Sequence, residues 1–126
     1  MTTQQQTTPS LGQLLDLTGK VALVTGAGQG VGEATARMLA ELGAAVAVND
    51  FFPERAADVA SSIRDSGGRA FGVQADVSDP GSVTDMVAAI GDELGPVDIL
   101  VNNAGNAGAE RDALAPNPSF WESEPA

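Results

Sequence analysis

Short strand-like segments alternate with segments of helical periodicity along the chain, and this alternation limits the folds open to it more than any other feature. Val21 to Val24 and Ala44 to Val48 are continuous apolar runs, too short for buried helices and typical of strands covered on both faces. Segments 69–74 and 98–102 are predicted as two further strands. After each of the first three strands, apolar residues recur three and four positions apart, which indicates amphipathic helices.

Proline, glycine and aspartate residues mark where these helices begin and end. Gly43 is expected to end the first helix, and the glycines at 67–68 the second. Pro53 suits the first turn of the second helix, and Asp79 is a predicted N-cap followed by Pro80 at the first helical position of the third. The buried stripes predicted for the three helices are, in order, Val31, Ala34, Thr35, Met38, Leu39 and Leu42; Ala56, Val59, Ala60 and Ile63; and Val83, Met86, Val87, Ile90 and Leu94.

The order β-α-β-α-β-α-β predicts an α/β fold with right-handed crossovers. We expect a Rossmann-like doubly wound parallel sheet with four strands and three helices on its two faces, in the strand order 3-2-1-4 that is usual for this fold. The strand at 98–102 would then lie at an edge, yet Ile99 to Val101 is uninterrupted apolar sequence. Edge strands normally carry charge, proline or cover. We therefore expect an incomplete sheet, with further strands following in the chain or supplied by another chain.

Composition excludes several kinds of function. The 126 residues include 6 Lys and Arg against 17 Asp and Glu, a net charge of −11, which disfavours a nucleic-acid partner bound by general electrostatics. There is no Cys, His or Tyr, and Lys20 is the only lysine, so thiol chemistry, the commonest metal ligand and most acid–base groups are absent. Met1 to Ser10 has no positive charge and no apolar block, and no run approaches the roughly 18 apolar residues of a membrane span. We expect a cytoplasmic protein with no metal site and no membrane contact.

A glycine-rich segment joins the first strand to the first helix. It reads TGAGQGVG from Thr25 to Gly32. Glycine is needed where a turn has positive φ, where backbone approaches a ligand, and where a helix packs closely on a strand. The unpaired amides and the dipole at the start of the following helix suit a pyrophosphate. The spacing departs from the common G-x-G-x-x-G pattern, and a tight strand–helix connection without a ligand is the alternative.

Asp50 is the acid expected beside such a site. It ends the second strand, about 20 residues after Gly30, where a carboxylate accepts hydrogen bonds from the adenosine ribose. The alternative is a surface-turn or helix-cap aspartate. A 2′-phosphate about 4 Å from Asp50 would cost roughly 1–4 kcal/mol. The turn carries Gln29 and no basic residue, and Arg55 could soften this penalty without reversing it, so NAD is favoured over NADP.

Over about residues 14–105 the chain resembles a known family, the short-chain dehydrogenase/reductases. Two glycine-containing signatures carry the resemblance, and together they are far more specific than either alone. The matching segments are Thr25-Gly26-x-x-x-Gly30-x-Gly32, similar to the family's cofactor signature; Asn102-Asn103-Ala104-Gly105, similar to its second signature; Asp76-Val77, similar to the pair that holds the adenine ring; and Leu17-Thr18-Gly19-Lys20, similar to the usual approach to the first strand.

The resemblance implies a role for each matching residue. Segment 26–32 would cradle the pyrophosphate, Asp50 would bind the ribose, and Asp76 would accept a hydrogen bond from the adenine amino group. Segment 103–105 would line the ribose on the nicotinamide side, where the strand order reverses. For Asp76 the alternative is an acid in a turn before a helix, and for Asn102 we favour a buried amide that ties neighbouring strand ends. The candidate cofactor-binding residues are Gly26, Gly28, Gln29, Gly30, Val31, Gly32, Asp50, Phe51, Asp76, Val77, Asn103, Ala104 and Gly105.

The residues that carry the family's chemistry are not found. The family transfers hydride between a nicotinamide and a carbonyl or hydroxyl carbon, with a Tyr four residues before a Lys as proton donor, a Ser, and an Asn on a later helix. No Tyr is present, and Lys20 opens the first strand, on the wrong side of the fold. We therefore assign no catalytic residue. We expect the NAD-binding half of a short-chain oxidoreductase, which lacks catalysis by itself.

Two other functions stay open. One is a non-catalytic dinucleotide-binding module or sensor completed by a partner chain, and the other is a small α/β domain that binds nothing. We divide the chain into a flexible N-terminal tail (1–13), an NAD-binding half-domain (14–105), and an irregular, truncated loop or tail (106–126). Leu14 to Leu17 is expected to lay a few leucines on the domain. The substrate is not encoded in these residues, and a homo-oligomer of a full-length form is left open.

Overall fold

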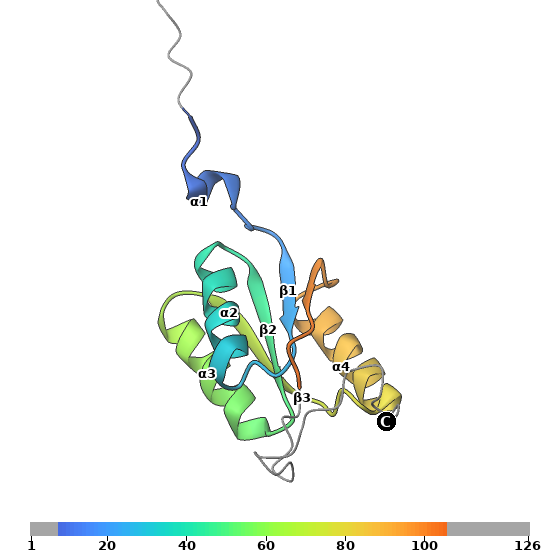
Figure 1. Cartoon of the computed structure of the whole chain (residues 1–126). Helices are drawn as coiled ribbons and strands as arrows, with labels where there is room; N and C mark the ends of the chain where they lie inside the picture. The colour runs from blue at the N-terminus through green and yellow to red at the C-terminus, as the bar shows by residue number, and fades with distance from the viewer. Residues whose placement is uncertain (1–7, 106–126) are drawn as a thin grey trace, which may run out of the picture.

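Four parallel strands form the single sheet of the computed structural model, which describes residues 8–105. The sheet order is β3-β2-β1-β4 (Figure 1), so the predicted Rossmann-like class and strand order are confirmed. The predicted loop or tail at 106–126 lies outside the described residues. The strands are β1 (Val21–Val24), β2 (Ala45–Asp50), β3 (Arg69–Gln74) and β4 (Ile99–Val101).

Three helices cover the sheet, and a single helical turn precedes it. The predicted helix boundaries are confirmed by Pro53 and Pro80 at first-turn positions and by the Asp79 carboxylate, which accepts a hydrogen bond from the Gly81 amide at 3.0 Å. Gly43 has a φ of +102° directly after its helix, which is the left-handed conformation expected of a C-terminal cap. The helices are α1 (Leu11–Leu14), α2 (Gly30–Glu41), α3 (Pro53–Asp65) and α4 (Pro80–Glu93).

Two hydrophobic layers fix the helices on opposite faces of the sheet. Side chains alternate along a strand, so Ala22 and Val24 of β1 face α2 and α3, whereas Val21 and Leu23 face α4. Figure 1 shows α2 and α3 together on one side of the sheet and α4 on the other. Every residue of β1 and β2 is buried, which explains why residues 21–24 and 45–48 are continuous apolar runs.

The predicted buried stripe of α2 is wrong at Val31, Ala34 and Met38, which are exposed, whereas Leu39 packs against the core as expected. Val31 is 75% exposed and Met38 is 63% exposed, and the buried residues of this helix are Gly32 and Ala36. At Gly32 a larger side chain has no room, because a Cβ there would overlap the Gly26 carbonyl oxygen. The predicted stripe of α3 is confirmed in full, whereas in α4 only Val87 is exposed among the predicted residues.

Strand ends and the N-terminal segment differ in detail from expectation. Strand β2 extends two residues beyond the predicted apolar run and ends at Asp50, and β4 is shorter than the predicted 98–102. The turn α1 overlaps the predicted tail, and of the leucines expected on the domain only Leu17 packs on the core. At the edge of the described sheet, Leu100 of β4 is 56% exposed, and a neighbouring strand beyond it stays a prediction.

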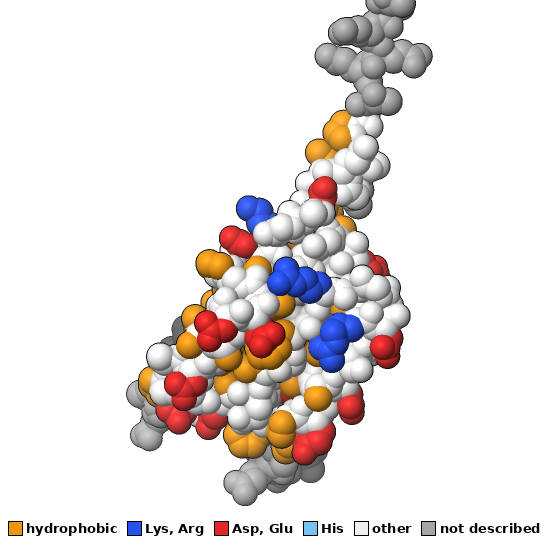
Figure 2. Space-filling model, turned by 180° about the vertical axis from the view of Figure 1, so that it is seen from behind, with side chains coloured by type: hydrophobic (Ala, Val, Ile, Leu, Met, Phe, Trp, Pro, Cys, Tyr) orange, Lys and Arg blue, Asp and Glu red, His pale blue; other side chains and the backbone are white. Residues whose placement is uncertain are grey.

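The surface reflects the acidic composition. On the face shown in Figure 2, acidic side chains are spread among apolar ones and basic side chains are few. Among the described residues, one ion pair lies within 4.0 Å, between Glu33 and Arg37 on α2. None of the helices between residues 8 and 105 has the length and hydropathy that a membrane crossing requires.

Candidate functional site

The candidate residues gather at one edge of the sheet. Because all four strands are parallel, the segments that follow them emerge at their common carboxyl edge. These segments are the glycine turn after β1, residues 51–52 after β2, residues 75–79 after β3 and residues 102–105 after β4. In a sheet of this order, the strand order reverses between β1 and β4. Ligands of such folds bind in the crevice at that point, outside the carboxyl ends of the strands.

The glycine turn presents the start of α2 without a side-chain cap. Gln29 occupies the N-cap position and its side chain makes no capping hydrogen bond. The first amides of a helix have no intrahelical acceptor, so they are available to an external anion. Gly30 has a φ of +59°, and a Cβ built on it would meet no atom of residues 8–105 within 4 Å. Glycine at this position therefore opens free space in front of the helix.

Two other glycines of the turn are required by close packing. A Cβ on Gly26, which has a φ of +61°, would lie 2.8 Å from the Ala104 Cα. A Cβ on Gly32 would overlap both the Asn103 side chain and the Gly26 carbonyl oxygen. The turn therefore packs directly against the segment that follows β4, although about 75 residues separate the two in the chain.

Hydrogen bonds join the same two segments. The Thr25 hydroxyl accepts from the backbone amides of Asn103 and Ala104, at 3.0 Å each. The Asn103 side-chain amide donates to the Gly26 carbonyl at 3.2 Å. Our assignment of the tying amide to Asn102 is wrong, because Asn102 is exposed and the neighbouring Asn103 makes this contact. The two predicted signatures thus form one continuous piece of structure.

Asn49 is a structural residue of the site that the sequence analysis missed. Its side chain is 1% exposed. It donates to the carbonyls of Val73 and Ala75, at 3.2 and 3.4 Å, and accepts from the Gly26 amide at 3.4 Å. A single buried amide therefore links the glycine turn, β2 and the segment after β3. A polar residue inside an otherwise buried strand was the signal that could have revealed it.

Asp50 lies at the predicted place, at the end of β2 beside the glycine turn. Its carboxylate is 6% exposed and accepts hydrogen bonds from the Gly28 amide at 3.0 Å and the Phe52 amide at 2.9 Å. A carboxylate has about four acceptor positions, and donors within residues 8–105 occupy two of them. Phe52 is the N-cap of α3, so the Asp50 carboxylate accepts from an amide at the start of this helix. Asp50 therefore also serves in part as a helix-cap aspartate, the alternative role given above. Phe51, the next candidate residue, is exposed.

Asp76 and Val77 follow β3 at the same edge. The Asp76 carboxylate accepts from the hydroxyl and the backbone amide of Ser78, and these bonds lower the pKa of Asp76 below its ordinary value of 3.8. The carboxylate therefore stays charged at neutral pH. These bonds to Ser78 also give Asp76 the alternative role, that of an acid in a turn before a helix. The Asp76 backbone amide donates a hydrogen bond to the Ser82 hydroxyl at 3.0 Å, and Val77 is exposed.

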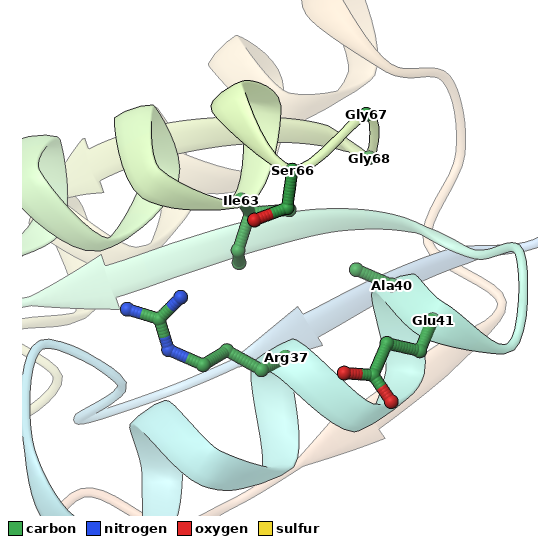
Figure 3. A pocket seen from close by; sticks show the side chains of 7 residues that line it. All are labelled: Arg37, Ala40, Glu41, Ile63, Ser66, Gly67 and Gly68. Carbon is green, nitrogen blue, oxygen red and sulfur yellow. The ribbon is translucent and has the colours of Figure 1, made fainter.

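A hollow elsewhere on the molecule does not coincide with these residues. It has a volume of about 260 Å³ and lies between the ends of α2 and α3, lined by Arg37, Glu41, Ser66 and others (Figure 3). Glu41 is at the far end of α2 from the glycine turn, roughly 16 Å away at 1.5 Å per residue. Residues 8–105 contain no cluster of three or more acidic side chains that could hold a metal ion.

Comparison with known proteins identifies the family. Residues 20–123 match the short chain dehydrogenase family, and the chain therefore belongs to it. The chain is 48% identical over 87 residues to 2,3-dihydro-2,3-dihydroxybenzoate dehydrogenase of Bacillus subtilis, a match that covers 69% of this chain and 33% of that relative. It is 47% identical over 91 residues to the short-chain dehydrogenase/reductase homolog YusS of Bacillus subtilis, covering 71% of this chain and 84% of YusS.

Solved structures agree with this assignment. A hydroxysteroid dehydrogenase from Escherichia coli is 40% identical with a TM-score of 0.72, over 75% of this chain and 40% of that one. A 7α-hydroxysteroid dehydrogenase complexed with NADH and 7-oxo glycochenodeoxycholic acid has the same identity and TM-score, over 75% of this chain and 37% of that one. The chain thus spans about a third of the length of the dihydroxybenzoate dehydrogenase and most of the length of YusS.

Proposed function

We propose that the chain is the cofactor-binding portion of a nicotinamide-dinucleotide-dependent oxidoreductase that acts on an alcohol or carbonyl group. The observation that carries this proposal is the uncapped start of α2 beside the Asp50 carboxylate at the carboxyl edge of the sheet. A solved relative of the same fold is described as a complex with NADH. In our proposal the site-bearing unit is residues 14–105, and the absence of Cys favours a cytoplasmic location.

The pyrophosphate would lie against the amides of the glycine turn. The positive end of the α2 dipole favours an anion there, and Gly30 leaves the space open. Glu33, the acid in the first turn of α2, is paired with Arg37 at 3.0 Å. This pairing offsets the one negative charge of that first turn.

The adenosine end would lie over β2 and β3. Donors in the described part of the chain take two of the roughly four acceptor positions of Asp50, and the ribose hydroxyls would use the others. A 2′-phosphate would face the same carboxylate, at a cost of roughly 1–4 kcal/mol for like charges about 4 Å apart. We therefore propose NAD as the preferred nucleotide. Phe51 and Val77, both exposed, would flank the adenine, with Asp76 as an acceptor for its amino group.

The dinucleotide, when bound, would supply a hydride donor or acceptor. The Asn103 to Gly105 segment would hold its nicotinamide-side ribose, because Asn103 is fixed on the glycine turn through Gly26. No Tyr occurs in the 126 residues to act as proton donor, so we expect no turnover from this chain alone. A dehydrogenase assay with NAD and a panel of alcohols tests this expectation, and clear turnover would contradict it.

A second candidate function is a non-catalytic dinucleotide-binding module completed by a partner chain. The match covers 84% of YusS, so a family relative exists whose length is mostly spanned by the matched part of this chain. This observation favours the second candidate. The two candidates predict different sequences downstream of residue 126 in the reading frame. A Tyr-x-x-x-Lys sequence there would support the oxidoreductase, and its absence would support the module.

The pyrophosphate site is tested by substituting Gly30. Gly30→Ala places a methyl group in the open space before α2, and we expect it to abolish the thermal stabilisation that NAD gives the wild type, which is about 2.7 kcal/mol at 100 times Kd. Gly19→Ala is the matched control, because Gly19 also has positive φ and free space at its Cβ but lies outside the turn. Equal NAD stabilisation of both variants would contradict the proposed site.

The ribose role is tested by replacing Asp50. Asp50→Ala removes the charge facing the 2′ position, so the ratio of the NADP and NAD dissociation constants should fall by about tenfold or more. Circular dichroism of the variant controls for folding, because Asp50 also holds two backbone amides. An unchanged ratio in folded protein would remove Asp50 from the ribose role.

A further inference from the structure

Arg55, a basic residue beside the predicted ribose site, lies against an aromatic ring. It is in the first turn of α3, and its guanidinium carbon is 4.4 Å from the centroid of the Phe52 ring. Phe52 in turn meets Phe51 edge to face, with ring centroids 5.4 Å apart and an interplanar angle of 82°. The Arg55 guanidinium is therefore held on the Phe52 ring, and Phe52 is itself in contact with Phe51 just after the end of β2.

The Cβ of Arg55 nevertheless lies close to the Asp50 carboxylate. The Cβ of Arg55 and the Oδ2 of Asp50 both lie 2.5 Å from the point that a Cβ on Gly28 would occupy. Despite this proximity, Arg55 and Asp50 form no ion pair; within residues 8–105, Glu33 and Arg37 make the one pair within 4.0 Å. The guanidinium is directed to the Phe52 face instead of the acid.

We propose that Phe52 is a specificity-determining residue, which holds the Arg55 guanidinium away from the position that a 2′-phosphate would occupy. This inference rests on the proposed nucleotide site. Arginine binds phosphate through paired N–H donors, so a released Arg55 would either contact the 2′-phosphate directly or pair with Asp50 and neutralise it. Both outcomes weaken discrimination against NADP.

The size of the effect follows from the contact that Phe52 makes. An exposed cation–π contact corresponds to about a two- to fivefold change in an equilibrium constant. Phe52→Leu keeps an apolar side chain and removes the aromatic face, so it should lower the ratio of the NADP and NAD dissociation constants about two- to fivefold. Phe52→Tyr keeps the face and should leave the ratio at its wild-type value.

The test is calorimetric titration of the full chain with NAD and, separately, with NADP. It uses the wild type, Phe52→Leu, Phe52→Tyr, Arg55→Gln and the Phe52→Leu/Arg55→Gln double variant. We expect Phe52→Leu to lower the ratio only when Arg55 is present. A general structural defect would weaken both nucleotides together and leave the ratio unchanged. Phe52→Met, made in parallel, provides the same comparison if the leucine variant does not fold.

Two results would overturn the inference while leaving the proposed function intact. One is normal NAD binding with an unchanged ratio in both Phe52→Leu and Phe52→Met. The other is an equal fall in the ratio with and without Arg55. If the folded wild type bound neither nucleotide, the proposed function itself would fail, and this inference with it.

Discussion

Replacing Asn49 by Ala tests whether one buried amide holds the nucleotide edge of the sheet together. The substitution removes three hydrogen bonds, to the Gly26 amide and to the Val73 and Ala75 carbonyls, from a position that is 1% exposed. A hydrogen bond of this kind contributes about 1 kcal/mol net, and a buried group left without a partner costs at least as much. We therefore expect a loss of about 3 kcal/mol in the free energy of unfolding.

The assay is urea unfolding followed by circular dichroism, together with a thermal melt. For a domain of this size, about 3 kcal/mol corresponds to a fall in Tm of roughly 12 to 24 °C. Gln74→Ala is the matched control, because Gln74 also donates from a side-chain amide to a carbonyl, that of Phe51 at 3.2 Å, but at an exposed position. The control should change stability by no more than about 0.5 kcal/mol. Equal effects of the two substitutions would refute the reasoning.

Two further predictions concern the core and the turn after β3. Ile90→Ala removes the largest fully buried side chain of the hydrophobic layer between α4 and the sheet. Urea unfolding should show that the free energy of unfolding falls by about 2–5 kcal/mol. A fall below about 1 kcal/mol would mean that α4 does not pack as described. Ser78 lowers the pKa of Asp76, so the charged carboxylate stabilises the folded state above about pH 3.8, and this contribution disappears as the pH falls through and below that value. The difference in stability between wild type and Asp76→Asn should therefore shrink on acidification, and a difference independent of pH would contradict the assigned hydrogen bonds.

Local signals in the sequence were sufficient to predict the framework of the fold. Two strands, β1 and β3, have the expected bounds, because apolar runs and flanking glycines are properties of consecutive residues. Pro53 and Asp79 begin their helices as predicted, since capping depends on backbone groups only two or three residues away. The strand order followed from the resemblance to a family and from the rules for parallel sheets.

Features that depend on distant residues were not predictable in the same way. The close approach of Gly32 to Asn103 leaves no room for a side chain at that position of α2. Val31 and Met38, which contributed to the helical period, are exposed instead. Asn49 gains its role from carbonyls on β3 and from the glycine turn, which lie more than 20 residues away. Adjacent asparagines after β4 could not be distinguished by sequence, because only the fold shows that Asn103 turns inward.

The central claim is that the start of α2 and the end of β2 together hold a nicotinamide dinucleotide. The most direct test is calorimetric titration of NAD into the full chain, after circular dichroism has shown that the protein is folded. We predict saturable heat with one nucleotide per chain. Folded protein that gives no saturable heat with either oxidised or reduced nucleotide at millimolar concentration would contradict the claim.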